Sequence, residues 1–147
     1  MTEDSAQVVR IERTFDAPAE DVFDAWTSAE VIRRWFIPAQ DWGTPSAEVD
    51  LRVGGTIRVV MRDPDGSEVG AGGEYTVIER PHRLAFTWTF DDDPSNQQMI
   101  ELEFTEQDGA TTVLFVNSNI SQEERRDQQY EGWQTCLDNM ERALASN

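Results

Sequence analysis

This sequence of 147 residues contains one cysteine, one histidine and no lysine. Cys136 cannot form an intramolecular disulfide, and its apolar surroundings favour a buried structural thiol over a nucleophile. His82, the only histidine, follows Pro81, where a surface turn is the simplest interpretation. Cysteines and histidines at zinc-ligand spacing are absent. Asp91-Asp92-Asp93 could attract a cation, but carboxylates on one loop are usually just solvated. We therefore assign no catalytic residue, metal or cofactor.

Positive charge is scarce as well. Twelve arginines stand against 29 acidic residues, which gives a net charge of −17. A negative field of this strength opposes binding to nucleic acid and to anionic membranes, so we expect neither as a partner. The same surface keeps a protein soluble at high salt. A salt-adapted source and an ordinary acidic, lysine-poor surface both explain it, and the sequence leaves the two open.

Long apolar runs and targeting signals are also lacking. No stretch approaches the eighteen apolar residues of a membrane span, and Glu3 and Asp4 do not suit a signal peptide. Together with the low cysteine content, this favours a cytoplasmic protein. The length suits a single domain over residues 1–147, with residues 1–7 polar and expected to be frayed.

The most distinctive stretch is the last one, residues 121–145, which reads as one amphipathic helix. Ser121 followed by Glu124 has the spacing of a capping box and marks its start. Such a helix is about 30 Å long, enough to cross a sheet. Its apolar residues recur at spacings of three and four and share one stripe: Tyr130, Trp133, Cys136, Leu137, Met140 and Leu144.

The chain before this helix begins with a strand and two short helices. Residues 8–15 alternate between apolar and polar, which is typical of a strand. Pro18 opens the first helix. Thr27 with Glu30 has capping-box spacing and predicts a second helix over residues 29–35, ended by Pro38.

Six further strands then follow at close spacing. Asp63-Pro64-Asp65-Gly66 is typical of a tight turn, and short connections of this kind imply antiparallel neighbours. One side of each strand is apolar, so one face of the sheet must be covered by the helices. The predicted strands are residues 47–52, 56–62, 70–79, 83–90, 98–106 and 111–119. The predicted fold is α+β, in the order β-α-α-β6-α, with a curved antiparallel sheet wrapped around the C-terminal helix.

Several motifs resemble bacterial proteins related to the C-terminal domain of the Hsp90 ATPase activator. They occur in the same order over about residues 8–145. They are Arg13-Thr-Phe-Asp-Ala-Pro18, Val22-Phe-Asp-Ala-Trp-Thr27, Arg34-Trp-Phe36, Asp50-Leu-Arg-Val-Gly-Gly55, Met61-Arg-Asp-Pro-Asp-Gly66, Gly73-Glu-Tyr75, Arg80-Pro81, Arg83-Leu84 and Gly132-Trp133. That family belongs to the helix-grip superfamily, which includes START and Bet v 1-type domains.

The resemblance implies the same β-α-α-β6-α fold and a cavity between the sheet and the long helix. It carries no common catalytic motif. The Hsp90 activators add an N-terminal domain that these residues do not contain, so the resemblance leaves an interaction with Hsp90 open.

Aromatic and methionine side chains are the main candidates for a ligand site, because an apolar cavity needs such a lining. For each of them, simple core filling is the competing interpretation. The candidates are Trp35, Phe36, Trp42, Met61, Phe86, Trp88, Phe104, Trp133, Leu137 and Met140.

Three polar residues stand on otherwise apolar faces. Arg13 and Asn117 do so by strand alternation, and Tyr75 could present a hydroxyl to a cavity. A buried arginine needs a partner. Arg13 could therefore anchor a ligand, pair with a structural carboxylate or lie exposed, and a structural role is favoured.

Three functions remain open from the sequence. The first is binding of a small hydrophobic molecule beneath the long helix. The second is a cyclase- or hydrolase-like enzyme that uses the polar groups of the cavity. The third is a co-chaperone-like or stress-response partner-binding domain, which would need an exposed apolar patch. Nothing in the sequence decides between a monomer and a homodimer.

Overall fold

The computed structural model describes residues 7–145. Its elements, in chain order, are β1 (Gln7–Phe15), α1 (Ala19–Thr27), α2 (Ala29–Trp35), β2 (Gly43–Val49), β3 (Thr56–Arg62), β4 (Glu68–Glu79), β5 (Arg83–Phe90), β6 (Gln98–Gln107), β7 (Ala110–Ile120) and α3 (Glu123–Ala145). This order is the β-α-α-β6-α order expected from the sequence, and the fold is α+β.

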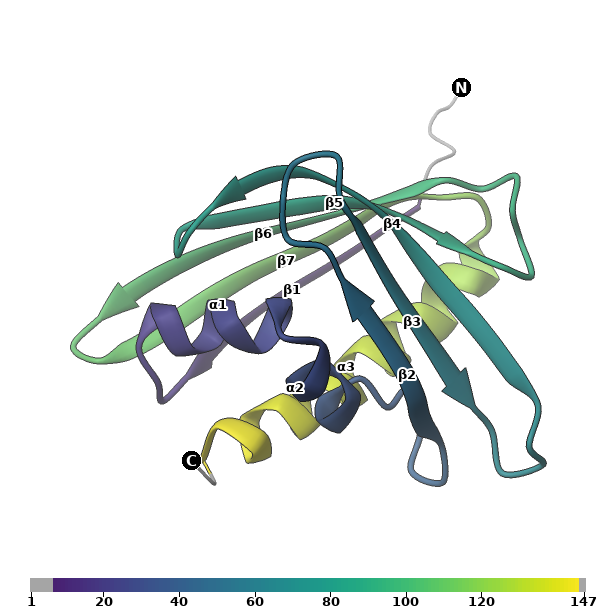
Figure 1. The fold of residues 1–147 in the computed structure, drawn as a ribbon, viewed down its shortest axis with the longest axis horizontal. Coiled ribbons are helices and arrows are strands. Elements are labelled where there is room, and N and C mark those ends of the chain that lie inside the picture. Colours follow the sequence, from purple (N-terminus) through teal and green to yellow (C-terminus); the bar gives the residue numbers. More distant parts are fainter. Residues whose placement is uncertain (1–6, 146–147) are drawn as a thin grey trace.

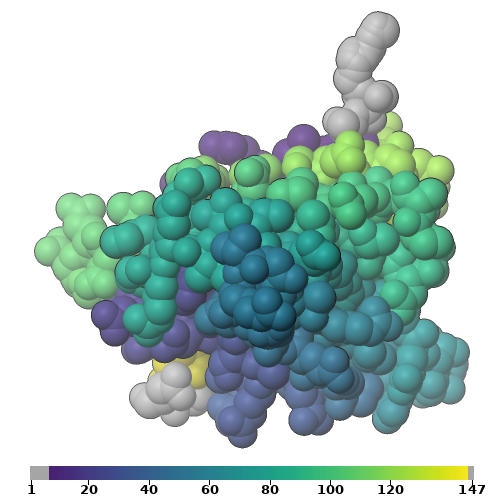
Figure 2. Space-filling view, turned by 45° about the horizontal axis from the view of Figure 1, so that its top comes forward, coloured from purple at the N-terminus to yellow at the C-terminus, as the bar shows by residue number. Residues whose placement is uncertain are grey.

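The seven strands form one antiparallel sheet in the order β1-β7-β6-β5-β4-β3-β2. Strands β2 to β7 lie beside their chain neighbours, and β1 joins the opposite edge by pairing with β7. The sheet curves strongly and α3 runs across its concave side, with α1 and α2 filling one end (Figure 1). In the space-filling view, teal and green residues from the second half of the sheet cover the upper part of the face shown (Figure 2).

Strand alternation decides which side chains face α3. In β5, Leu84, Phe86 and Trp88 are buried on the concave side, while Thr87 and Thr89 face outward and are half-buried. Charged residues occupy the outer positions of β6, with Glu101 and Glu103 exposed between buried apolar neighbours. Because only one face is covered, β3, β6 and β7 show the alternation of a half-solvated antiparallel sheet.

The stripe on α3 is buried much as its spacing predicts. Trp133, Cys136, Leu137 and Met140 lie against the sheet and α2. Gln129, which extends the same stripe by one turn, is also buried. Residues four apart on a helix share one face, so this single row reaches most of the concave side.

The helix starts differ from their predicted caps. The Oγ atom of Ser28, not Thr27, accepts a hydrogen bond from the Val31 amide at 3.4 Å. Thr27 is still inside α1, where its hydroxyl donates to the Phe23 carbonyl at 3.0 Å. Similarly, α3 begins at Glu123, so Ser121 lies before the helix, and its amide donates to Asn96 Oδ1 at 3.2 Å. Both shifts are within the one or two residues by which helix ends are commonly uncertain.

The largest boundary error concerns β2. The sequence predicted a strand over residues 47–52, but β2 spans Gly43–Val49. Pro45 did not prevent this pairing because β2 is an edge strand, where one side of the backbone needs no partner. The Asp63–Gly66 turn is as expected, with Asp63 Oδ1 accepting from the amides of Asp65 and Ser67 and Gly66 at φ +89°.

The expectation of a frayed start over residues 1–7 falls mostly outside the described residues, which begin at Gln7. Gln7 is the first residue of β1 and pairs with Ile120 of β7. Residues 7–145 share one hydrophobic core, drawn from the sheet and all three helices.

Candidate functional site

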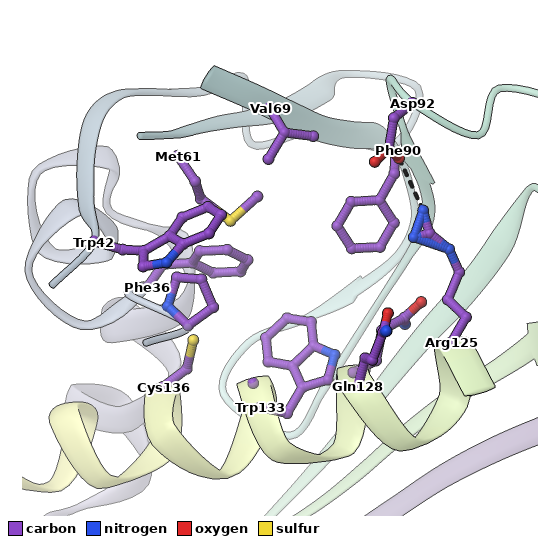
Figure 3. A pocket seen from close by; sticks show the side chains of 13 residues that line it. Phe36, Trp42, Met61, Val69, Phe90, Asp92, Arg125, Gln128, Trp133 and Cys136 are labelled. Carbon is purple, nitrogen blue, oxygen red and sulfur yellow. Dashed lines mark hydrogen bonds and ion pairs between the residues drawn. The ribbon is translucent and has the colours of Figure 1, made fainter. Parts of the chain in front are cut away.

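A pocket of about 200 Å³ lies between α3 and the end of the sheet formed by β3, β4 and β5. Figure 3 shows its side chains converging from the helix below, the strands above and the α2–β2 connection at one side. The lining residues are Phe36, Pro38, Trp42, Met61, Val69, Phe90, Asp92, Arg125, Gln128, Gln129, Gly132, Trp133 and Cys136.

One end of the pocket is apolar. Phe36, Met61, Trp133 and Cys136 are buried there, and the half-buried Trp42 stands beside them (Figure 3). Alternation along β3 points Met61 inward, and the helical stripe brings Trp133 and Cys136 to the same wall. A thioether and aromatic faces adapt to varied apolar shapes.

Gly132 forms part of the wall in the middle of α3. Glycine destabilises a helix interior by about 0.5–1 kcal/mol relative to alanine. Close packing does not demand it here, because a Cβ atom at this position would first meet Pro38 Cβ at 3.6 Å, an ordinary contact distance. The missing side chain therefore leaves room in the pocket rather than avoiding a clash.

The other end of the pocket carries charge. Arg125 Nη2 donates to Asp92 Oδ1 at 2.8 Å, and Arg125 Nε lies 3.6 Å from Asp93 Oδ2. The same guanidinium lies 5.2 Å from the ring centre of Phe90. These contacts tie α3 to the β5–β6 connection at the pocket rim, as the dashed line in Figure 3 marks.

Behind this end lies a buried cluster of amides. Asn117 Nδ2 donates to Gln98 Oε1 at 3.0 Å, and Gln129 Nε2 donates to Gln98 Oε1 at 2.9 Å and to Asn117 Oδ1 at 2.7 Å. Trp133 Nε1 donates to Asn117 Oδ1 at 3.2 Å. Gln98 and Asn117 have no exposed surface, so these bonds offset the desolvation of the amides.

Two buried titratable groups, Cys136 in the pocket wall and Tyr75 elsewhere in the core, keep their protons at neutral pH. Burial raises the pKa of the Cys136 thiol well above its ordinary value, so the pocket wall presents a neutral thiol. Burial likewise raises the pKa of the Tyr75 phenol, with the negative charge of Asp50 adding to the shift. Neither group is prepared to act as a base or a nucleophile.

Four of the predicted ligand residues line the pocket: Phe36, Trp42, Met61 and Trp133. Four others belong to the packed centre instead. Trp35, Phe86 and Trp88 surround a void of only about 10 Å³, and Leu137 is buried nearby on α3. Trp35 is held there because its Nε1 donates to the Ala25 carbonyl at 2.8 Å.

Phe104, Met140 and Tyr75 are buried away from the pocket lining. Phe104 packs edge-on against Phe23 with ring centres 5.5 Å apart. Tyr75 packs against Phe86, and its hydroxyl has no hydrogen-bond partner among the described residues. Helical and strand spacing identified their buried faces, but it could not tell which part of the core is hollow.

Arg13 and Asn117 have structural partners. Arg13 Nη1 contacts Asp138 Oδ1 at 2.6 Å and Nη2 donates to Gln134 Oε1 at 2.6 Å, and its side chain is 20 % exposed. This is the structural pairing that the sequence favoured, and it fastens β1 to α3. Asn117 stands behind the pocket wall, where it orients Gln129 and Trp133.

Sequence reasoning missed most of the polar wall. Arg125, Gln128, Gln129 and Gly132 lie about one turn apart along the face of α3 that includes Trp133, but none of them was part of the predicted apolar stripe. Continuing the apolar stripe toward the start of the helix would have found Gln129. Nothing in the sequence places Asp92 or Val69 beside them, because they arrive from other elements.

Within residues 7–145, no group of three or more His, Cys, Asp or Glu side chains is arranged to hold a metal ion. The same residues include no helix long and apolar enough to cross a membrane.

Residues 16–145 match the protein family described as "Activator of Hsp90 ATPase homolog 1-like protein". Among solved structures, the AHSA1-like protein from Aeromonas hydrophila shares 30% identity, with a TM-score of 0.79, covering 95% of this chain and 93% of that one. A Chromobacterium violaceum protein aligns with a TM-score of 0.85 at 22% identity, covering 94% and 97% of the two chains. The AHSA1 protein from Silicibacter pomeroyi aligns with a TM-score of 0.83 at 23% identity, covering 95% of this chain and 98% of that one. No curated protein sequence matched.

Proposed function

This chain belongs to the Activator of Hsp90 ATPase homolog 1-like family, and from that premise we propose that its domain binds a small apolar molecule in the pocket between the sheet and α3. Family membership fits a ligand-binding helix-grip domain without fixing what the domain binds. The pocket supplies the more specific argument.

The observation that carries this proposal is Gly132. A pocket left over from imperfect packing would be reduced by any side chain that fits at this position, and alanine would also stabilise the helix. Because Gly132 has no side chain, it leaves space in the pocket beside Trp133 and Cys136. A residue that lowers helix stability while enlarging a pocket is expected where the space has a use.

The size of the pocket limits the ligand. An apolar cavity of about 150 Å³ is known to hold benzene, so about 200 Å³ suits a molecule of about ten non-hydrogen atoms. Binding would remove apolar surface of Phe36, Met61 and Trp133 from water at about 25 cal/mol per Å².

The first experiment is native mass spectrometry of the purified protein, followed by denaturing extraction to identify any released molecule. We expect a co-purifying apolar compound, or saturable binding of added propylbenzene. Gly132→Leu should abolish both by filling the pocket. Thr135→Leu adds the same side chain to α3 away from the pocket and should bind as the unmodified protein does. Binding that survives Gly132→Leu would contradict the proposal.

Cys136 gives an independent readout, because it is the one cysteine of the sequence and lines the pocket. A bound ligand should slow its reaction with a small uncharged thiol reagent. The comparison needs a pH high enough to form some thiolate, because burial raises the pKa of this thiol. Equal rates with and without a saturating ligand would place the ligand elsewhere.

Partner binding is the second candidate, and one observation favours it. Leu51 and Val53, in the turn between β2 and β3, are 42% and 64% exposed. Two neighbouring side chains make a smaller patch than protein interfaces usually need. An enzymatic role is supported less, because Cys136 and Tyr75 both stay protonated. The cytoplasmic location and the oligomeric state remain predictions.

A further inference from the structure

The pocket is polar at one end only. Arg125, Gln128 and Gln129 lie toward the start of α3, and Cys136 lies three turns beyond Arg125, about 16 Å along the axis at 1.5 Å per residue. Figure 3 shows the same division, with Asp92, Arg125 and Gln128 together at one side and Trp42, Met61 and Cys136 at the other. A ligand that satisfies both ends has an apolar body and one polar head.

The charge at the polar end is negative on balance. Arg125 is the single cation among the lining residues, and Asp92 at 2.8 Å and Asp93 at 3.6 Å both offset it. The chain as a whole carries −17, which adds to the repulsion of any approaching anion. An anionic head would have to displace one of the carboxylates to reach the guanidinium.

Gln129 and Trp133 offer a ligand no free donor at this end. Both amide protons of Gln129 are donated, to Gln98 and Asn117, and the indole proton of Trp133 is donated to Asn117. Gln129 Oε1 accepts only from Gln98 Nε2, at 3.1 Å, among the described residues. A carbonyl oxygen can accept two hydrogen bonds, so this one can still accept another.

Gln128 does not alter this balance. It is exposed at the rim and can turn either its oxygen or its amide toward a ligand. The fixed acceptors that remain are Gln129 Oε1 and the carboxylate of Asp92. They can accept a hydrogen bond from the ligand without disturbing an ion pair. An acceptor on the ligand would instead have to bond to Arg125, whose remaining N–H groups lie beside Asp92 and Asp93.

We infer that the pocket selects ligands with an apolar body and a neutral or cationic head that donates a hydrogen bond, such as an arylalkyl amine or alcohol, over carboxylates of the same size. This inference rests on the ligand-binding function proposed above. The amine places its N–H groups toward Asp92 and Gln129, and the aromatic body lies between Met61 and Trp133.

The test uses four probes with one body: propylbenzene, 3-phenylpropan-1-ol, 3-phenylpropan-1-amine and 3-phenylpropanoate. Calorimetric titration into the full chain at low salt should give the amine the highest affinity and the alcohol a higher affinity than propylbenzene. The carboxylate should bind at least about tenfold more weakly than the amine, as expected for one unit charge reversed near a carboxylate. Raising the salt should narrow this gap.

Asp92→Asn removes the carboxylate at the rim, and Asp127→Asn is its matched control. Both side chains are 61% exposed and each pairs with an arginine of α3, but Asp127 does not line the pocket. Both variants change the net charge equally. We expect Asp92→Asn to reduce the amine-to-carboxylate ratio about threefold or more, and Asp127→Asn to leave it nearly unchanged.

The outcomes separate this inference from the proposed function. A carboxylate that binds as tightly as the amine would overturn the selectivity while leaving ligand binding intact. Equal effects of the two aspartate variants would show that selectivity comes from overall charge, and would also overturn it. Failure of all four probes, propylbenzene included, would overturn ligand binding itself and the inference with it.

Discussion

The space between the sheet and α3 has two halves that differ in how completely they are filled. Around Trp26, Trp35 and Trp88, aromatic rings meet at centre distances of about 4.6–6.1 Å and leave a void of about 10 Å³. Beyond Trp133, toward Phe90 and Arg125, the same layers enclose about 200 Å³. Trp133 separates the two halves and lines both.

The difference lies in the elements that close each end. The filled half is covered by α1 and α2, which contribute Trp26 and Trp35. Neither α1 nor α2 covers the open half, where the α2–β2 connection carries Trp42 and the β5–β6 loop carries Asp92. A concave sheet and a straight helix diverge away from their line of contact. A tightly packed core and a pocket can therefore adjoin each other in one domain.

Removing the dividing wall should have the largest effect. Trp133→Ala joins the void to the pocket and deletes a buried indole, so we expect a loss of about 3–5 kcal/mol in the free energy of unfolding. Urea unfolding followed by circular dichroism measures it. Trp42→Ala, on the half-buried rim, should cost clearly less. Equal losses would mean that the two halves are equally packed.

The amide cluster tests whether the wall depends on its hydrogen bonds. Asn117→Leu keeps the approximate volume but leaves Trp133 Nε1 and one Gln129 proton without their acceptor. We expect a loss of about 2–3 kcal/mol, the desolvation of buried groups left unpaired. Ser118→Ala, on the outward side of the same strand, is the control and should change stability little. If Asn117→Leu left the free energy of unfolding unchanged, the cluster would not stabilise the wall.

A substitution at Gly132, in the open half, should raise the free energy of unfolding instead of lowering it. Gly132→Ala should stabilise the protein by up to about 1 kcal/mol, because alanine is the better helix former and a Cβ fits there. Affinity for propylbenzene should fall at the same time. Thermal unfolding and calorimetry measure the two effects. Tighter binding by the alanine variant would refute the interpretation of Gly132 as a space-making residue.

The smallest expected effect on stability concerns Asp91, which is adjacent to Asp92 in the sequence. A hydrogen bond from Arg58 holds the pKa of Asp91 below its ordinary value. A lowered folded pKa means that this stabilisation is complete above the ordinary carboxyl range, near pH 4, and is lost as the pH falls through the lowered value. Both side chains are about half exposed, so we expect only a few tenths of a kcal/mol.

Urea midpoints measured between pH 6 and pH 2 should show this contribution as a difference between the unmodified protein and Asp91→Asn. The difference should shrink in acid. The ratio of amine affinity to carboxylate affinity should be unaffected by Asp91→Asn, whereas Asp92→Asn should lower it. A difference that grows as the pH falls would contradict the sign of the pKa shift.

The sequence predicted much of the fold because its signals are local. Alternation gave the inner face of β5, and the spacing of Trp133, Cys136 and Met140 gave the buried face of α3. Boundaries were less certain, as β2 shows, because an edge strand containing Pro45 carries a weak pattern.

The site was predictable only in part. Phe36, Trp42, Met61 and Trp133 were proposed from chemistry alone and line the pocket, while Trp35, Trp88 and Phe104 satisfy the same chemistry inside the packed core. Aromatic character does not distinguish a cavity wall from its filling. The distinction depends on how far two layers stand apart at each point.

The sequence by itself determined the element order, the apolar faces and the acidic charge, because residue spacing and composition act over a few neighbours at a time. Only the tertiary structure decided where the core stays open and that Asp92 of one loop meets Arg125 of α3, 33 residues apart. It also decided that the amides of Gln98, Asn117 and Gln129 form one cluster. These contacts depend on sheet curvature and on the angle of α3, which result from the packing of the whole chain.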